Sequence, residues 1–275
     1  MLKDIFITAF QLSKKYMNLM QPFLLFLIIL LLFMGNVAAA KSGIVNNIIL
    51  MILFFFLVVV FMAGWSNAFK AAIEYDKINE LKTPEEREYI PPLFLGDFAE
   101  GVGKYFFKFA GAGVFYMILA LIFALGMYYI ATNMIGIPEA FSKVNLSQIT
   151  HSEAAFKTFF FSLSDADRLR LAKINLLGFI AAGLFSYLTM LIPVSLVMGR
   201  KNFFADILTS IKLLFKKFFV SLNLFLFFNI LLFSASVINA AGANNVILSI
   251  IGLLLFCFIN LYYFMTLFIY YEKAR

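Results

Sequence analysis

The stretch FADILTSIKLLFKKFF, residues 204–219, decides how this sequence is interpreted, because it lies between two long apolar stretches and belongs to neither. Its lysines make it too polar to cross a bilayer, and its phenylalanines make it too apolar for an ordinary loop. Apolar residues recur at Ile207, Ile211, Leu214 and Phe218, which is the spacing of one face of an α-helix. The stretch is therefore predicted to be an amphipathic helix.

Two other segments share this pattern when the chain is aligned on aspartate. We call the three elbow segments, and they cover residues 2–20, 95–113 and 204–222. Each has a lysine eleven residues after its aspartate, and the pairs are Asp4 and Lys15, Asp97 and Lys108, and Asp206 and Lys217. Each is expected to lie in the membrane interface with an apolar stripe toward lipid and its charges toward headgroups or cytoplasm, turning the chain by about 90° into the next span.

The composition is that of an integral membrane protein, since 63% of the 275 residues are hydrophobic and 13% are charged. A span needs about 20 mainly apolar residues to cross the hydrocarbon layer. The stretches that qualify are 22–40, 44–66, 109–131, 174–198, 218–241 and 246–270. The predicted fold class is an all-α polytopic membrane protein with six transmembrane helices.

The elbow segments divide the predicted membrane domain, residues 1–275, into three repeated units of an elbow helix and a two-helix hairpin. The units cover 2–77, 95–200 and 204–275. The middle unit differs from the others because 132–173 separates its two spans. We expect this stretch to be an extracytoplasmic insert with a short Phe-rich helix, since long inserts in compact folds are usually functional or disordered.

Lysines and arginines fix the predicted orientation through the positive-inside bias. With a cytoplasmic N-terminus, 16 of the 22 fall on the inner side, and most of the others lie on the long outer insert. Both termini are therefore expected to be cytoplasmic. The AAA at 38–40 resembles a signal-peptidase site, but the elbow pattern gives 2–20 a structural role, so the first span is expected to be retained.

Several function classes are excluded by what the sequence lacks. Cys257 cannot form an intramolecular disulfide alone, and His151 cannot make a histidine-based metal cluster. No GxxxxGK[ST], HExxH or GxSxG motif is present, so an enzyme is not expected, and neither is a cofactor. The net charge of +7 is interpreted as a topology signal rather than as a sign of nucleic-acid binding.

Polar residues within the spans are neutral. Tyr187, Asn229 and Asn260 are the candidates for intramembrane polar contacts, and the two asparagines are placed to pair across the last hairpin. A substrate pathway lined by these residues is the alternative. Pro193 is expected to kink the fourth span.

The layout resembles a bacterial group of six-span membrane domains that includes YciC-type inner-membrane proteins and the membrane domain preceding some glycerophosphodiester phosphodiesterases. The resemblance lies in elbow-then-span openings such as FADILTSIKLLFKKFF, and in a last span that runs out through LFIYYEKAR, residues 267–275. It implies a multi-pass protein of the cytoplasmic (inner) membrane of a bacterium, without established catalysis, and it transfers no site residues.

Two functions therefore stay open. The first is a non-enzymatic membrane protein that acts on the bilayer or through a membrane or cytosolic protein partner. The second is the permease subunit of a transporter, energised by a separate ATPase, with the elbow at 204–219 as its cytoplasmic coupling surface.

Overall fold

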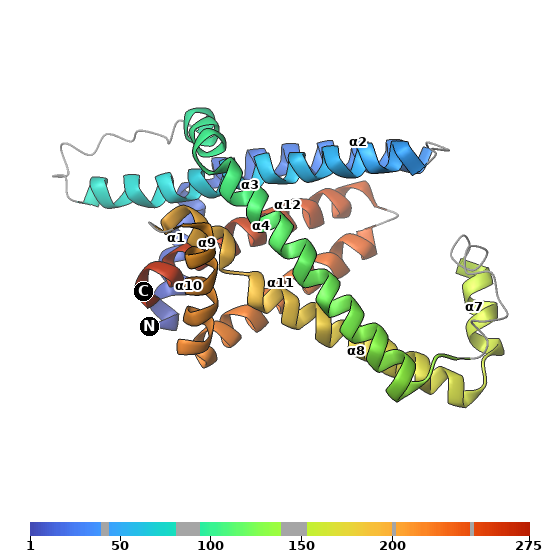
Figure 1. Cartoon of the computed structure of the whole chain (residues 1–275). Coiled ribbons are helices and arrows are strands. Elements are labelled where there is room, and N and C mark those ends of the chain that lie inside the picture. The colour runs from blue at the N-terminus through green and yellow to red at the C-terminus, as the bar shows by residue number, and fades with distance from the viewer. Residues whose placement is uncertain (40–43, 81–93, 139–152, 200–201, 243–244) are drawn as a thin grey trace. The chain divides into compact units, whose positions relative to one another are not determined.

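The structure, a computed structural model, describes residues 1–39, 44–80, 94–138, 153–199, 202–242 and 245–275, and this part of the chain is helical without strands (Figure 1). The elements are α1 (Leu2–Lys15), the 3₁₀ turn η1 (Met17–Leu19), α2 (Met20–Ala39), α3 (Ile44–Glu80), α4 (Phe94–Ile130), the π-helical turn η2 (Ala131–Ile135), α7 (Glu153–Ser162), α8 (Asp165–Thr189), α9 (Ile192–Met198), α10 (Phe203–Lys216), α11 (Phe218–Ala241) and α12 (Val246–Ala274).

Six stretches among the described residues are long and apolar enough to cross a membrane, so the chain is a multi-pass membrane protein. The last two spans begin at the predicted residues, 218 and 246. α3 continues beyond its predicted span to Glu80, and α4 begins before its span at Phe94. The charged segments that follow the span in α3 and precede the span in α4 are therefore continuous with the same helices.

The described residues form two compact units, one from Met1–Val114 with Thr189–Arg275 and the other from Phe115–Leu188. The sequence predicts one domain divided at the elbow segments, whereas the unit boundaries fall inside α4 and at the end of α8. The two units are described separately below.

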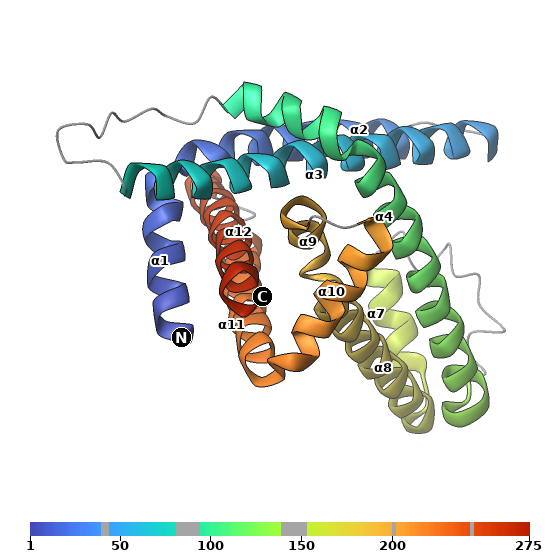
Figure 2. The same ribbon diagram turned by 60° about the vertical axis from the view of Figure 1, so that its left-hand side comes forward.

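The core of the first unit lies at the end where α1, α9 and α10 meet the C-terminal half of α3 and the end of α12 (Figure 2). Trp65 is its largest fully buried side chain. The Trp65 indole stacks on Phe23 with ring centroids 5.1 Å apart, and its Nε1 donates a 2.9 Å hydrogen bond to the Leu19 carbonyl. A buried indole N–H needs such a partner, so Trp65 ties α3 to the turn before α2.

The predicted fourth span is interrupted near Pro193. α8 ends at Thr189, and α9 starts at Ile192 with the proline in its first turn. A proline is tolerated there because the backbone N–H groups of the first turn have no hydrogen-bond partner within the helix, so the N–H that proline lacks is not needed. From Ile192 to Val197 every residue is buried, so α9 forms part of the core of the first unit.

The second unit contains the C-terminal part of α4, then η2, α7 and most of α8. α4 ends at the π-helical turn, and Gly136 follows with a φ of 82°. Glycine adopts this left-handed conformation without steric cost, so it suits the exit from a helix. The Phe-rich part of the predicted insert is helical, as expected, in α7.

Candidate functional site

The elbow segments differ in whether the chain bends. α1 ends at Tyr16 with φ −111° and ψ 41°, and α10 ends at Lys217 with φ −124° and ψ 45°. Both helices contain 14 residues before these bends. In the second segment α4 continues through Lys108 and Phe109, so the predicted elbow is absent there.

The expected orientation of the apolar stripe was wrong for α1 and for most of α10. In α1, Ile5 and Ala9 are fully buried inside the protein, where α1 packs on α12. In α10, Ile207 and Leu214 are buried against the rest of the first unit, and only Phe218, just beyond the bend, is exposed. The stripe is therefore covered by protein and does not face lipid.

The second and third elbow segments are joined by an ion pair between Lys108 and Asp206. The Lys108 Nζ lies 2.9 Å from Asp206 Oδ2 and also donates a 3.4 Å hydrogen bond to the Leu196 carbonyl. The Asp206 side chain is only 2% exposed, so the expectation that this charge faces headgroups or cytoplasm was wrong. A carboxylate as deeply buried as this one is stabilised by a cation, because desolvation strongly disfavours an unpaired charge.

Gly199 gives the Asp206 carboxylate the room it needs. A Cβ at position 199 would lie 2.1 Å from Asp206 Oδ1 and 2.4 Å from the Ser195 carbonyl oxygen. Gly199, which follows the last residue of α9, therefore lies directly beside the carboxylate. The C-terminal Arg275 contacts the end of α9 nearby, where its Nη1 donates a 3.2 Å hydrogen bond to the Met198 carbonyl.

Asp97 is also withdrawn from solvent, with 9% of the residue exposed, and its backbone carbonyl accepts a 2.7 Å hydrogen bond from the Asn67 amide. Gly101, one turn later, allows this approach of α4 to α3. A Cβ at Gly101 would lie 2.7 Å from the Ala63 carbonyl oxygen and 2.5 Å from the Asn67 Cβ. Small residues at a helix crossing permit such close backbone contact.

The remaining elbow charges lie nearer the surface. Lys15 donates to the Asp76 carboxylate, and this hydrogen bond raises the pKa of the Lys15 ammonium above its ordinary value. The Asp4 side chain is 67% exposed. Lys217 is half-buried, and its Nζ lies 3.7 Å from the Met1 sulfur. The three aspartates thus have different environments in spite of their equivalent spacing.

α10 carries a second apolar face that the protein leaves largely exposed, and α1 carries a similar face that is partly covered by α12. On α10 this outer face consists of Phe204, Leu208 and Phe215, which are 69%, 57% and 59% exposed. Lys212 and Lys216 are exposed beside it. The outer face of α1 consists of Ile7 and Phe10, flanked by Lys3 and Lys14, with the Lys14 Nζ 5.8 Å from the centre of the Phe10 ring.

The intramembrane asparagines do not pair with each other. The Asn229 amide donates a 2.8 Å hydrogen bond to the Phe225 carbonyl, and the Asn260 amide donates one of the same length to the Phe256 carbonyl. Each bond lies within its own helix, four residues back, so the predicted pairing was wrong. Tyr187 is buried and belongs to the second unit, whereas the two asparagines belong to the first.

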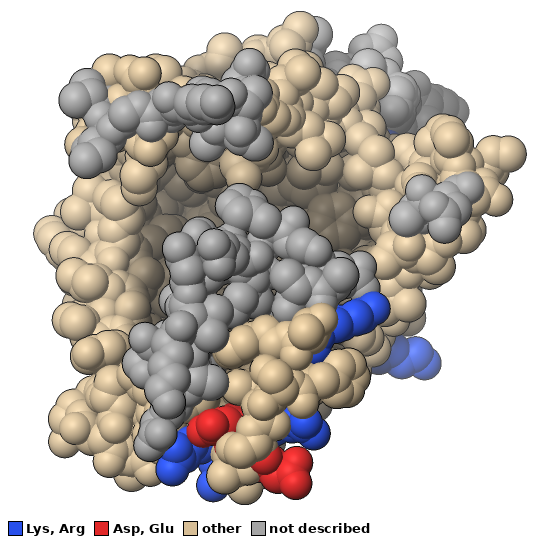
Figure 3. Space-filling view, turned by 90° about the vertical axis from the view of Figure 1, so that its right-hand side faces the viewer, with Lys and Arg blue, Asp and Glu red and all other residues tan. Residues whose placement is uncertain are grey.

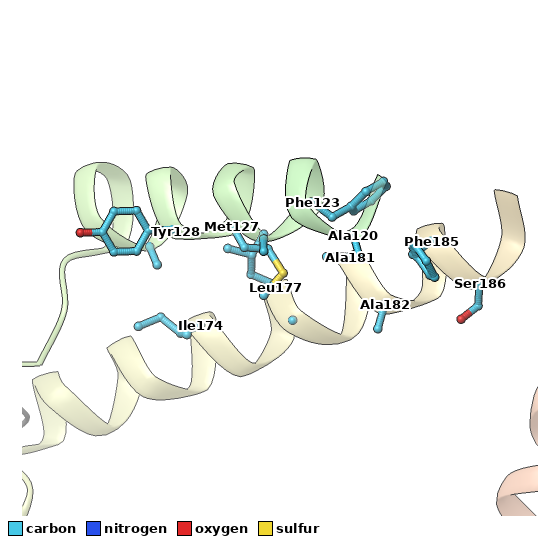
Figure 4. Close-up of a pocket in the computed structure, with 13 residues that line it drawn as sticks. Ala120, Phe123, Met127, Tyr128, Ile174, Leu177, Ala181, Ala182, Phe185 and Ser186 are labelled. Atoms are coloured by element: carbon cyan, nitrogen blue, oxygen red, sulfur yellow. The ribbon is translucent and has the colours of Figure 1, made fainter. Parts of the chain in front are cut away.

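A groove of about 540 Å³ lies between α4 and α8 inside the second unit (Figure 4). Small residues such as Ala120 and Ala182 form part of its lining, and Phe123, Met127 and Phe185 supply its bulky side chains. The lining is almost wholly apolar, which is ordinary for the interior side of a membrane hairpin. The groove has no group of polar side chains that point toward a common position, so it does not define a chemical site.

Four charged residues at the start of α8 pair locally. The face drawn in Figure 3 shows charges of both signs near its lower edge and further lysine or arginine to the right of them, and much of its coloured surface is uncharged. In the first turns of α8, Arg168 pairs with Asp165 at 3.5 Å and Arg170 with Asp167 at 3.4 Å. Since each pair lies three residues apart on the same helix, these four charges largely neutralise one another.

The arrangement depends on three residues that the sequence analysis did not identify. Trp65 and Ser221 accommodate the bends, and Gly101 accommodates the crossing of α3 and α4. The Ser221 hydroxyl lies 3.0 Å from the carbonyl oxygens of Leu214 and Phe218, which precede and follow the bend at Lys217. A serine soon after an amphipathic helix is too common a pattern to predict this contact.

Comparison with models of protein families, with known proteins and with solved structures gave no match for this chain.

Proposed function

We propose that this chain is a non-enzymatic, multi-pass protein of the cytoplasmic membrane of a bacterium that acts through contacts with partner proteins. The six apolar helices support the membrane assignment, and the distribution of lysine and arginine supports cytoplasmic termini. The resemblance of the layout to six-span bacterial proteins is the reason for the bacterial membrane. An effect on membrane organisation belongs to the same proposal, because the same helices contact the bilayer.

The outer face of α10 is the observation that carries the proposal. A surface helix needs one apolar face to pack on its protein, and Ile207 and Leu214 already provide it. Phe204 and Phe215 lie on the opposite face and leave most of their aromatic surface uncovered. Exposed apolar surface bordered by charge is typical of an interaction site, and aromatic side chains are enriched at such sites.

The ion pair between Lys108 and Asp206 makes this outer face a fixed surface. It holds α10 to α4 from the buried side, and the Tyr270 hydroxyl adds a 3.5 Å hydrogen bond from α12 to the Leu213 carbonyl. A partner that docks on α10 therefore meets aromatic side chains whose helix is already ordered. Ordering the surface in advance lowers the entropic cost of binding.

We also propose that the elbow segments are three copies of one unit. Equal helix lengths and nearly equal bend conformations at Tyr16 and Lys217 support this for the first and third copies. For the second copy, support comes from Lys108, which occupies the shared lysine position and bonds the shared aspartate of the third. The copies would then have diverged in whether the helix bends.

Affinity purification in mild detergent, followed by mass spectrometry, tests the function. We expect a specific protein to co-purify with the wild type and to be lost when Phe204 and Phe215 are both changed to Gln. Phe179 and Leu184 on α8 are the matched control, since they are also exposed, at 78% and 51%. Retention of the partner by the α10 variant, or its loss from both variants, contradicts the proposal.

The same surface supports the second candidate, a permease subunit with a separate ATPase. Such a subunit needs a cytoplasmic coupling surface, and the outer face of α10 has the exposed lysines and aromatic residues for one. An ATPase among the co-purified proteins would favour this candidate. The path near Asn229 and Asn260 is tested separately, since transport unaffected by Asn229→Leu combined with Asn260→Leu rules it out.

A further inference from the structure

A small polar cavity lies between the C-terminal half of α3 and the first turns of α4. Its volume is about 210 Å³, and Tyr75 of α3 and Asp97 of α4 are among the residues that line it. The close crossing of the two helices at Gly64 and Gly101 sets its position. This cavity plays no part in the contact surface on α10, so its function is a separate question.

The charges around the cavity pair with one another except for one. Lys70 pairs with Glu74 at 3.8 Å on α3, and Lys104 pairs with Glu100 at 3.7 Å on α4. Asp97 is left without a cation among the described residues. The charge that acts on it most strongly is the Glu100 carboxylate, which has the same sign.

The Asp97 carboxylate is buried but only partly satisfied. The residue is 9% exposed, and the Tyr75 hydroxyl interacts with its carboxylate. The Oδ2 atom is buried and has no hydrogen-bond partner among the described residues. An unpaired acceptor of this kind in a low-dielectric site costs free energy, so a donor that also carries positive charge would stabilise it.

We propose that this cavity binds a primary ammonium group, with Asp97 Oδ2 as its principal acceptor. A volume of about 210 Å³ corresponds to roughly seven water molecules at about 30 Å³ each, enough for a small amine with part of its hydration shell. A divalent metal fits less well, because the described residues contain no cluster of three histidine, cysteine, aspartate or glutamate side chains that could hold one. The ammonium group could come from a soluble amine or from an ethanolamine lipid headgroup.

Calorimetric titration with ethanolamine tests the site in the full chain, reconstituted in nanodiscs of phosphatidylcholine. We expect saturable binding that Asp97→Asn weakens at least tenfold and that Asp4→Asn leaves unchanged. Asp4 is the matched control because it has the same position in the first elbow segment but is 67% exposed. Absence of saturable binding by the wild type overturns the proposal, as does equal binding by the Asp97→Asn variant.

Two further arms separate the possible ligands. Replacing phosphatidylcholine with phosphatidylethanolamine should weaken the apparent ethanolamine affinity several-fold if the headgroup is the natural source, and should leave it unchanged if a soluble amine is. Sodium chloride that displaces ethanolamine at millimolar concentration shows a metal-cation site and overturns the ammonium assignment. An ethanolamine-dependent rise in the unfolding temperature of the wild type provides a second readout should Asp97→Asn fold poorly.

Discussion

α10 and the first half of α4 have the same spacing of aspartate, apolar stripe and lysine, yet α10 ends at a bend and α4 continues as one helix. A bend releases backbone carbonyls that need new donors. Ser221 lies within hydrogen-bonding distance of carbonyls before and after the α10 bend, whereas the corresponding residue of α4 is Ala112, whose side chain has no donor. The comparison indicates that the residues after the stripe, and not the stripe itself, decide whether the chain turns.

The first elbow segment satisfies its bend in a second way. Leu19 occupies the position of Ser221, and its carbonyl accepts the hydrogen bond from the Trp65 indole on α3. A long-range contact thus replaces the local serine. The four substitutions that follow test the two bends and the contacts of α4 with α10 and α3, in order of decreasing expected effect, each by equilibrium unfolding in mixed detergent micelles.

Trp65→Ala should give the largest loss, because it removes both the aromatic packing and the donor at the first bend. Replacing a buried tryptophan with alanine typically costs about 3–5 kcal/mol. Trp65→Phe keeps most of the packing and should cost clearly less. Equal losses for the two variants would show that the hydrogen bond to Leu19, and not the ring, dominates.

Asp206→Ala should cost about 3 kcal/mol, because it leaves the half-buried Lys108 ammonium without its carboxylate. Asp4→Ala is the control, since it has the same place in the first segment but is largely exposed. Its effect should stay within about 0.5 kcal/mol. Similar losses for the two variants would mean that the ion pair does not hold α10 to α4.

Gly101→Ala should cost about 1–3 kcal/mol, since the new methyl group would overlap the Ala63 carbonyl and the Asn67 side chain. Gly103, two residues later on the same helix, has no heavy atom within 4 Å of an added Cβ. Gly103→Ala should therefore be neutral or stabilising by up to about 1 kcal/mol. Equal tolerance of both changes would contradict the close crossing of α3 and α4.

Ser221→Ala should have the smallest effect, about 1 kcal/mol, because it removes one donor from the α10 bend. Ser236 is the control on the same helix, where its exposed hydroxyl bonds only the Leu232 carbonyl four residues back. A loss after Ser221→Ala no greater than after Ser236→Ala would show that serine does not stabilise the bend.

The helical spans were the part of the fold that the sequence could predict. Runs of apolar residues long enough to cross a bilayer predicted the first residues of α11 and α12 correctly. This was possible because the length and hydropathy of a run depend only on the local sequence. The break before Pro193 could be predicted as a kink. The burial of α9, which follows the break, could not be predicted. Burial depends on which distant helices pack there.

The environment of the elbow stripe could not be predicted for a physical reason. Lipid and protein interior are both apolar, so the spacing of Ile207 and Leu214 indicates a face but not what covers it. The same limit applies to Asn229, whose amide can bond another helix or its own backbone. Nor could the spacing of Lys108 and Asp206 reveal that residues of two different segments form one ion pair.

The orientation of the chain can be tested with cysteines in a Cys257→Ala background. A labelled position must be accessible to the reagent. Lys212 is exposed on α10 and is therefore suitable for a cysteine, whereas Ser210 on the same helix is buried. Asp165, with its side chain 99% exposed at the start of α8, reports on the opposite side. We expect an impermeant thiol reagent to label position 165 and not 212 in intact cells, and the reverse pattern would invert the proposed topology.

The most direct test of the contact surface is photo-crosslinking in cells from two neighbouring residues of α10. Phe215 lies on the outer face and is 59% exposed, and Leu214 is fully buried on the inner face. A photoreactive residue at 215 should yield a crosslinked species that contains a second polypeptide, and the same residue at 214 should yield none. Equal protein adducts from both positions, or none from position 215, would contradict the assignment of this face to partner contacts.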